Sequence, residues 1–208
     1  GLDYQFDDKN EMALVYRSKI SQNMKDGSAS LPNMPSTFGP LAGQNVKFNA
    51  KVVLPDTWTI GYGHKFNKKT RVELQAMRTN WHTYESLNVN LPYGATLSEQ
   101  KNWKDGWRFA IGLEHKFSDK YTGYLGYSYD QAGIPSAFAD FMVPTGNRQT
   151  YSIGLSYQDK RQRLTGALGY MAIGDKHMGS TNDLPAPLGF NSDSRKNYAK
   201  IWSLGYTM

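Results

Sequence analysis

The chain has 208 residues, of which 39% are hydrophobic and 20% are charged, and its mean hydropathy is −0.63. No stretch approaches the ~18 unbroken apolar residues of a membrane-spanning helix, which excludes a helical membrane bundle. The 14 Tyr, 9 Phe, 5 Trp and 20 Gly favour strands and turns, while the absence of Cys excludes disulfides, thiolate metal sites and thiol catalysis. The net charge of +6 indicates nucleic-acid binding only if the basic residues gather on one face.

Alternation of apolar side chains with small or polar ones predicts a chain of antiparallel strands. It is clearest between Trp107 and Phe117, where the odd positions are mostly apolar and the even positions are small or charged. Between Val46 and Phe66 the alternation survives Pro55, which predicts one long strand with a proline kink. In chain order, the predicted strands cover residues 1–6, 11–21, 46–66, 71–84, 107–117, 121–130, 151–157, 163–173 and 202–208.

The connections between these strands alternate in length. Residues 7–10, 67–70, 118–120 and 158–162 form short polar turns, whereas 22–44, 85–102, 131–147 and 174–195 form long loops. Short turns at one end and long loops at the other are typical of an outer-membrane β-barrel of a Gram-negative bacterium. The strands of a soluble β-sandwich also alternate apolar and polar side chains, but their polar face is rich in Lys and Glu. In this chain Gly, Ser, Thr and Ala dominate the corresponding face. We therefore predict an all-β, antiparallel transmembrane β-barrel, with residues 1–208 as a single domain.

The strand count leaves two architectures open. With residues 1–6 included there are nine strands, so the first and last strands run in the same direction, which single-chain bacterial barrels avoid. Either residues 1–6 are a stub on a small eight-stranded barrel, or the chain is the C-terminal part of a larger one. Inward glycines fit a wider barrel with a plug or ligand path, or a small barrel that retains a cavity.

Several segments, in order and at matching intervals, are together similar to one known family. They are RSKI (17–20), LPD (54–56), GYGHKF (61–66), WRFAIGLEHKF (107–117), GYSYDQ (126–131), Pro144, Arg148 and YSIGLSY (151–157). These segments resemble the C-terminal portion of the FadL/TodX family of outer-membrane transporters for fatty acids and hydrophobic compounds. The resemblance implies a fourteen-stranded barrel with an N-terminal hatch, which releases hydrophobic substrates laterally into the membrane. The chain departs from the family pattern at Met208, where an aromatic residue is usual.

The alternation places a group of charged residues inward near the long-loop end, namely Arg17, Lys19, Lys47, Lys51, Arg108, Asp130 and Arg148. A basic mouth attracts the carboxylate of an amphiphile, which makes Arg17, Lys19 and Arg108 candidate ligand-binding residues. The alternative is a structural charge ladder, because Arg108, Asp130 and Arg148 lie at the ends of three consecutive strands. For that trio, and for the lysines at 47 and 51, we favour the structural role.

The loop 131–147 carries apolar side chains where an exposed loop is usually polar. Such a patch indicates either a groove for a hydrophobic ligand or a loop packed on its neighbours to close the lumen, and both interpretations stay open. The candidate ligand-binding residues are Ile134, Phe138, Phe141 and Met142. The aromatic residues of the neighbouring segments, Trp81, Tyr84, Trp103 and Trp107, are interpreted as girdle or rim residues.

No catalytic, metal or nucleic-acid site is predicted. The sequence has no G-x-S-x-G motif, and His82 and His177 are isolated, so we expect no nucleophile paired with a base. Four scattered His without Cys offer no metal-ligand spacing, and we expect no cofactor. The cations are divided among turns, lumen and loops, which excludes nucleic acid, whereas outward Lys101 and Lys104 are suited to lipopolysaccharide phosphates.

The leading hypothesis is an outer-membrane channel that takes up hydrophobic or amphipathic small molecules, such as long-chain fatty acids, by diffusion and without enzymatic activity. The expected partners are the carried molecule, membrane lipid and lipopolysaccharide. The alternative is a small structural or adhesive outer-membrane barrel whose loops bind a surface partner and whose lumen transports nothing.

Overall fold

The structure is a computed structural model that describes residues 1–30, 45–139, 145–179 and 191–208. In these ranges the chain is all-β, and its helical elements are three short 3-10 segments: η2 (Trp81–Thr83), η3 (Pro92–Gly94) and η4 (Ser136–Phe138). None of the described helices has the length and apolar character needed to cross a membrane. The predicted all-β fold is confirmed.

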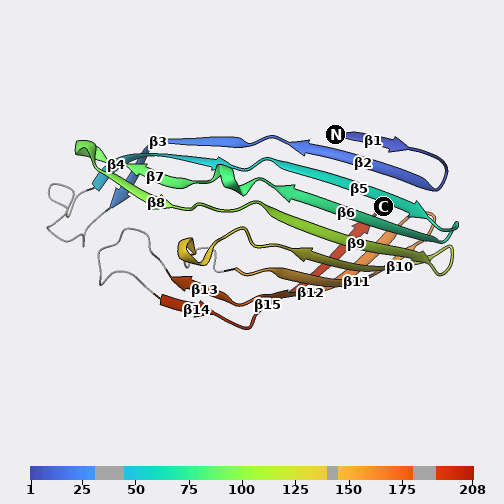
Figure 1. Cartoon of the computed structure of the whole chain (residues 1–208). Helices are drawn as coiled ribbons and strands as arrows, with labels where there is room; N and C mark the ends of the chain where they lie inside the picture. Colours follow the sequence, from blue (N-terminus) through green and yellow to red (C-terminus); the bar gives the residue numbers. More distant parts are fainter. Residues whose placement is uncertain (31–44, 140–144, 180–190) are drawn as a thin grey trace.

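A nine-stranded antiparallel sheet forms the body of the molecule, and each of its strands pairs with the next one along the chain (Figure 1). Its strands are β1 (Leu2–Gln5), β2 (Asn10–Arg17), β5 (Thr57–Lys65), β6 (Thr70–Thr79), β9 (Gly106–Lys116), β10 (Tyr121–Asp130), β11 (Arg148–Gln158), β12 (Arg163–Ile173) and β15 (Asn197–Thr207). β1 and β15 lie at opposite edges of the sheet and do not pair with each other. The chain therefore does not close a small eight-stranded barrel by itself.

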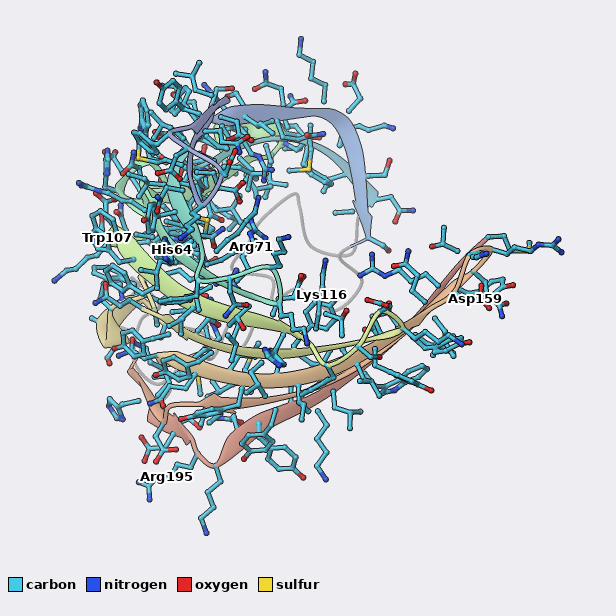
Figure 2. All side chains as sticks on the ribbon, turned by 90° about the vertical axis from the view of Figure 1, so that its right-hand side faces the viewer. His64, Arg71, Trp107, Lys116, Asp159 and Arg195 are labelled. Carbon is cyan, nitrogen blue, oxygen red and sulfur yellow. The ribbon has the colours of Figure 1, made fainter. Side chains whose placement is uncertain are left out.

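The two faces of the sheet differ in composition because alternate residues point to opposite sides. One row across five strands consists of Leu113, Leu125, Ile153, Leu168 and Trp202. The adjacent row on the other face consists of Gly112, Gly126, Ser152, Gly169 and Ile201. Figure 2 views the curved sheet from the short-turn end and shows Trp107 on the convex side, with Arg71 and Lys116 on the concave side. The apolar row shares the convex side with Trp107, which suits contact with lipid.

The four predicted short turns are present, and a side chain organises each of them. Asp7, Asn67 and Asp159 each accept hydrogen bonds from the backbone N–H groups two and three residues further on, at 2.7–3.0 Å. Ser118 accepts the equivalent pair at 3.2–3.3 Å. Hydrogen bonds to Asn10 and to the backbone lower the pKa of the exposed Asp7, and backbone hydrogen bonds lower that of Asp159. These local bonds fix the hairpins without help from a core.

The long loops contain strands that the alternation pattern did not predict. β3 (Ile20–Ser30), β7 (Ser86–Asn90) and β8 (Thr96–Gln100) join β4 (Asn45–Leu54), which lies within the predicted strand 46–66, in a four-stranded sheet in the order β3-β4-β7-β8. β13 (Lys176–Gly179) pairs with β14 (Asn191–Ser194). Figure 1 shows both sheets at the end opposite to the short turns. The prediction of plain loops over 22–44, 85–102 and 174–195 was therefore wrong. Most of these strands are rich in Ser, Asn and Lys, so they lack the apolar face that marks a lipid-exposed strand.

The predicted long strand 46–66 is two strands in different sheets. β4 ends at Leu54 and β5 begins at Thr57, with Pro55 and Asp56 between them. The neighbouring segment, in which β2 pairs with β5 and β3 pairs with β4, is interrupted opposite Pro55, since β2 ends at Arg17 and β3 begins at Ile20. Pro55 lacks the N–H that a continuous ladder requires, so pairing stops there although the alternation of side chains continues.

Candidate functional site

The loops above β9, β10, β11 and β12 are joined by backbone hydrogen bonds. The Lys104 N–H donates to the Gly133 carbonyl at 2.7 Å, and the Gly174 N–H donates to the Asn147 carbonyl at 2.7 Å. Gly133 and Gly146 allow this approach: a Cβ at Gly133 would lie 2.3 Å from the Lys104 carbonyl oxygen, and one at Gly146 would lie 2.5 Å from that of Gly174. The Ala132 N–H donates to Asn147 Oδ1 at 2.9 Å and links the two pairs, so the segments before β9, after β10, before β11 and after β12 form one connected layer.

An apolar cluster lies in this layer, and we call it the loop cluster. Its buried members are Ile134, Ala139 and Met178, and the half-buried Trp103 packs against them. The Trp103 ring also contacts the ring of Trp81, with centroids 4.8 Å apart, and that of Tyr84, with centroids 5.2 Å apart. The buried Trp103 Nε1 has no hydrogen-bond partner among the residues that the structure describes. Four segments that are distant in the sequence thus meet in one apolar cluster, namely 81–84, 103, 134–139 and 178.

A lysine borders the loop cluster. Lys176 and Met178 are two residues apart in β13 and therefore point to the same side of that strand. The Lys176 ammonium is half-buried and donates a hydrogen bond to the Ile134 carbonyl. Burial lowers the pKa of Lys176, because the apolar surroundings disfavour its charged form. Sequence reasoning missed this residue, since nothing in the segment 174–195 indicated that β13 returns to the loop 131–147.

The structure brings only some of the predicted loop residues to the cluster. Ile134 is buried in it at 6% exposure, and Phe138 ends η4 as a half-buried side chain. Phe141 and Met142 lie outside the described residues. Trp81 and Tyr84, interpreted from the sequence as girdle or rim residues together with Trp103, each contact the Trp103 ring in this layer.

The predicted charge ladder lies directly below, at the ends of β9, β10 and β11. Asp130 stands opposite both Arg108 and Arg148 in the sheet register. Arg148 Nη2 donates to Asp130 Oδ2 at 2.7 Å. Arg108 is exposed and forms no ion pair with a described residue, so its guanidinium is available to another anion. The buried Arg148 Nε likewise finds no acceptor in the described ranges.

The remaining predicted cations are spread over two levels. Arg17 ends β2 opposite Thr57, and Lys19 lies in the break between β2 and β3. Lys47 and Lys51 belong to β4 in the four-stranded sheet, where Lys47 Nζ donates to Ser28 Oγ at 3.1 Å. Lys51 lines a polar groove of about 620 Å³ between β4 and β7. These cations therefore do not form one compact cluster with Arg108.

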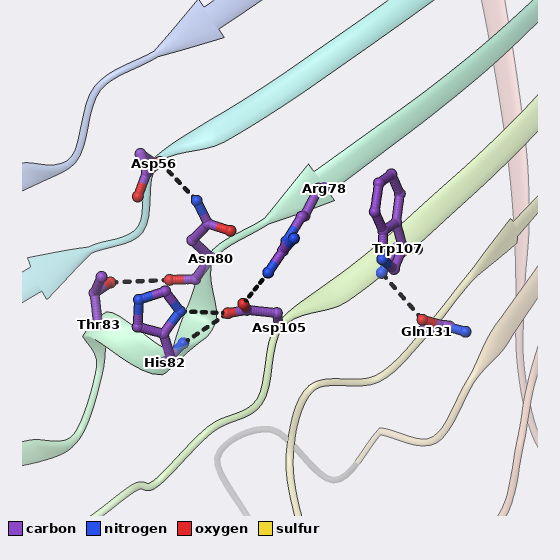
Figure 3. Close-up of polar contacts among 8 residues, drawn as sticks. All are labelled: Asp56, Arg78, Asn80, His82, Thr83, Asp105, Trp107 and Gln131. Carbon is purple, nitrogen blue, oxygen red and sulfur yellow. Dashed lines mark hydrogen bonds and ion pairs between the residues drawn. The ribbon is translucent and has the colours of Figure 1, made fainter.

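Asp105 organises a polar cluster at the start of β9, shown in Figure 3. Its carboxylate accepts a hydrogen bond from Arg78 Nη2 at 2.8 Å and one from the His82 N–H at 3.1 Å, and His82 Nδ1 lies 2.7 Å away. Partial burial opposes ionisation, but these bonds outweigh it and lower the pKa of Asp105 from 3.8 to about 2. Asp56 anchors the same region by accepting from Asn80 Nδ2 at 2.7 Å.

The prediction that two histidines are isolated was wrong. His82 pairs with Asp105, and His177 Nδ1 lies 2.8 Å from Asp193 Oδ1. Each partner is distant in the sequence, and only the pairing of loop segments reveals it. Among the described residues, no group of three or more His, Asp or Glu side chains is arranged to hold a metal ion.

A second charged cluster faces the concave side near the short turns. Arg71 on β6 pairs with Glu11 on β2 and with Glu73 on its own strand. Gly63 on β5 lies between them: a Cβ there would be 2.7 Å from Glu11 Oε1 and 3.2 Å from Arg71 Nη2. The ion pair therefore crosses β5 only because position 63 has no side chain. The sequence analysis did not identify this contact.

Comparisons with known proteins identify a family and several relatives that match this chain. The whole chain, residues 1–208, matches the family model described as outer membrane protein transport protein (OMPP1/FadL/TodX). It is 25% identical to the long-chain fatty acid transport protein of Salmonella typhi, over 99% of this chain and 47% of that protein. It is 25% identical to outer membrane protein P1 of Haemophilus influenzae, over 85% of this chain and 37% of that protein.

Solved structures show the same fold. The crystal structure of a Pseudomonas aeruginosa FadL homologue superimposes with a TM-score of 0.81 at 18% identity, covering 98% of this chain and 49% of that one. The Pseudomonas putida toluene transporter TodX superimposes with a TM-score of 0.58 at 18% identity, covering 98% and 46% of the two chains. The chain thus spans about half the length of its relatives, and it matches their C-terminal part.

Proposed function

The chain belongs to the OMPP1/FadL/TodX family of outer membrane transport proteins, and from this we propose that it takes up hydrophobic or amphipathic small molecules, such as long-chain fatty acids, by diffusion. The predicted resemblance and the predicted outer-membrane location are confirmed by the family match and by the relatives. The named relatives are transport proteins. Catalysis and a cofactor form no part of the proposal.

The division of the sheet into two faces is the observation that carries this proposal. The convex face is apolar and suits lipid, whereas the concave face carries small side chains together with charges at both ends. In the concave row of Gly112, Gly126, Ser152, Gly169 and Ile201, four of the five residues are small, and a wall of this kind leaves room beside it. The concave face is therefore the proposed path.

The proposed head-group contacts for an amphiphile are the inward cations near the long-loop end. Arg108 is the strongest of them, because it is exposed beside the Asp130–Arg148 pair and has no ion pair with a described residue. Arg17 and Lys19 extend the positive charge to β2. Ile134, Phe138, Phe141 and Met142 are proposed contacts for the alkyl part. Lipid contacts the outside of the barrel in this proposal, and exposed Lys104 stays a proposed contact for lipopolysaccharide. The expectation that Lys101 faces outward was wrong, because it is buried and its ammonium pairs with Glu99 at 2.7 Å.

Uptake by intact cells tests the proposal. A strain that lacks its own fatty-acid transporter is given this protein, and entry of radiolabelled oleate and radiolabelled toluene is measured. We expect both to enter, and Arg108→Gln to slow oleate by about tenfold while leaving neutral toluene unchanged, because a charge-assisted hydrogen bond is lost. Lys116→Gln, on the concave side at the opposite end of β9, is the matched control. Folded protein that admits neither compound would contradict transport and favour an adhesive barrel.

A further inference from the structure

A row of tyrosines on the convex face ends in a lysine. Tyr127, Tyr151, Tyr170 and Lys200 occupy directly opposed positions on the neighbouring strands β10, β11, β12 and β15, and all four side chains are exposed. We call them the tyrosine row. It lies two residues nearer to the long loops than the apolar row that ends at Trp202, so it shares the convex side. Because aromatic residues gather where a barrel leaves the lipid, the tyrosine row lies at the extracellular interface of the membrane.

Lys200 is the charged member of the row, and a charged side chain on the lipid side of a barrel is costly unless it reaches the interface. Its ammonium lies 6.0 Å from the centroid of the Tyr198 ring and forms no ion pair within the described ranges. The neighbours of Lys200 on the same face are Tyr170 across the strand pair and Tyr198 and Trp202 along β15, and none of them carries a carboxylate. The described part of the chain therefore does not neutralise Lys200.

A groove of about 900 Å³ opens beside Lys200 on the convex side. The Tyr127 and Tyr170 hydroxyls in it form no hydrogen bond with a described residue, whereas that of Tyr151 donates to Gln149 Oε1 at 2.9 Å. On its membrane side the groove is lined by the apolar row, namely Leu125, Ile153, Leu168 and Trp202. One groove thus combines an apolar wall with two unused hydroxyl donors and a cation at the interface.

This combination matches the chemistry of a phosphorylated lipid with acyl chains. A phosphate accepts charge-assisted hydrogen bonds from an ammonium and from hydroxyl groups, and an acyl chain covers apolar side chains. Inorganic phosphate would leave the apolar wall uncovered. Figure 2 shows a second exposed cation, Arg195, on the outside of the sheet, in the turn that leads into β15, where it pairs with Asp193. The extracellular position selects the lipid, because lipopolysaccharide is the phosphorylated lipid of the outer leaflet.

We propose that the tyrosine row is a binding site for the lipid A part of lipopolysaccharide on the outside of the barrel. Lys200 pairs with a phosphate, and the Tyr170 hydroxyl donates to the same head group. An acyl chain lies in the groove against Leu168 and Trp202. The site is separate from Lys104 in the loops, and it does not depend on what the lumen carries.

Native mass spectrometry of the protein, extracted from outer membranes in a mild detergent, tests the site. The probes are hexa-acylated lipid A with two phosphates, the same lipid without phosphates, and phosphatidylglycerol, each added at the same concentration. We expect lipid A to be retained about tenfold more than either of the others, because it alone combines two phosphates with several acyl chains. Equal retention of the phosphate-free lipid would overturn the pairing with Lys200. Equal retention of phosphatidylglycerol would overturn the assignment to lipopolysaccharide.

Variants of matched charge separate a specific contact from general attraction. Lys200→Gln should lower the retention of lipid A about tenfold, whereas Lys200→Arg keeps the charge and should retain it. Lys68→Gln makes the same change of charge in an exposed short turn at the opposite end of the barrel, and it should have no effect. Equal losses in Lys200→Gln and Lys68→Gln would refute the site. Unchanged retention in Lys200→Gln would mean that the lysine reaches water and not a phosphate.

Variants of matched size test the position of the acyl chain. Leu168 is 64% exposed and lines the groove, whereas Ile60 is 47% exposed on β5 and lies outside it. Leu168→Trp fills the groove and should lower the retention of lipid A about threefold, while Ile60→Trp should leave it unchanged. If the two variants retain lipid A equally, the acyl chain does not lie in this groove and the proposed site is wrong.

Discussion

Replacing Asp105 by Asn removes the carboxylate that joins β6, η2 and the start of β9. Its pKa falls from 3.8 to about 2, and one pKa unit corresponds to about 1.4 kcal/mol, so the shift sets an upper value of about 2 kcal/mol. The Asp105 side chain is 22% exposed, and solvent screens such pairs, so we expect Asp105→Asn to lose about 1 kcal/mol of unfolding free energy at pH 7.

The pH dependence of this contribution has a definite sign. Because folding lowers the pKa of Asp105, its contribution is fully present above pH 3.8 and is lost as the pH falls towards about 2. Urea unfolding in lipid vesicles, followed by tryptophan fluorescence at neutral pH and through this acid range, measures both effects. Asp119→Asn, in the exposed turn after β9, is the control. If the two variants unfold at the same urea concentration at neutral pH, the reasoning about Asp105 is wrong.

Two further predictions concern the concave face. Asp130→Asn leaves Arg148 without its carboxylate, so the midpoint of thermal unfolding in detergent should fall by several degrees, corresponding to about 1 kcal/mol; an unchanged midpoint would count against the ion pair. Gly63→Ala places a Cβ 2.7 Å from Glu11 Oε1 and should cost about 1 kcal/mol in urea unfolding. Gly112→Ala meets no atom within 4 Å and should change the unfolding free energy by less than about 0.5 kcal/mol. Equal effects of the two glycine variants would refute this explanation.

The membrane part of the fold was predictable because lipid imposes a strict rule on it. A strand with lipid on one side must alternate, so β10 and β12 were predicted with their observed bounds of 121–130 and 163–173. The same rule says nothing about a strand surrounded by water. Most of β3 and all of β7 and β8 were therefore not predicted as strands, whereas β4 fell within the predicted strand 46–66 because its side chains continue the alternation of β5.

The candidate site was predictable where it depended on one strand and its neighbours. The register opposite Asp130 follows from the pairing of neighbouring strands, since Asp130 ends β10, Arg148 begins β11 and Arg108 is the third residue of β9. Contacts between loops do not follow from any local period. Lys176 reaches Ile134 across 42 residues, and His82 reaches Asp105 across 23, only because several loops pack over the same strand ends.

Paired cysteine variants test most directly whether the concave face is the transport path. The chain has no native cysteine, so Ser152→Cys on the concave face and Ile153→Cys on the convex face each introduce a single thiol. A bulky, membrane-impermeant maleimide is applied to cells, and oleate uptake is measured before and after. We predict that Ser152→Cys is labelled and loses uptake, while Ile153→Cys is shielded by lipid and keeps it. Labelling of Ile153→Cys in place of Ser152→Cys, or full uptake by labelled Ser152→Cys, would contradict the account.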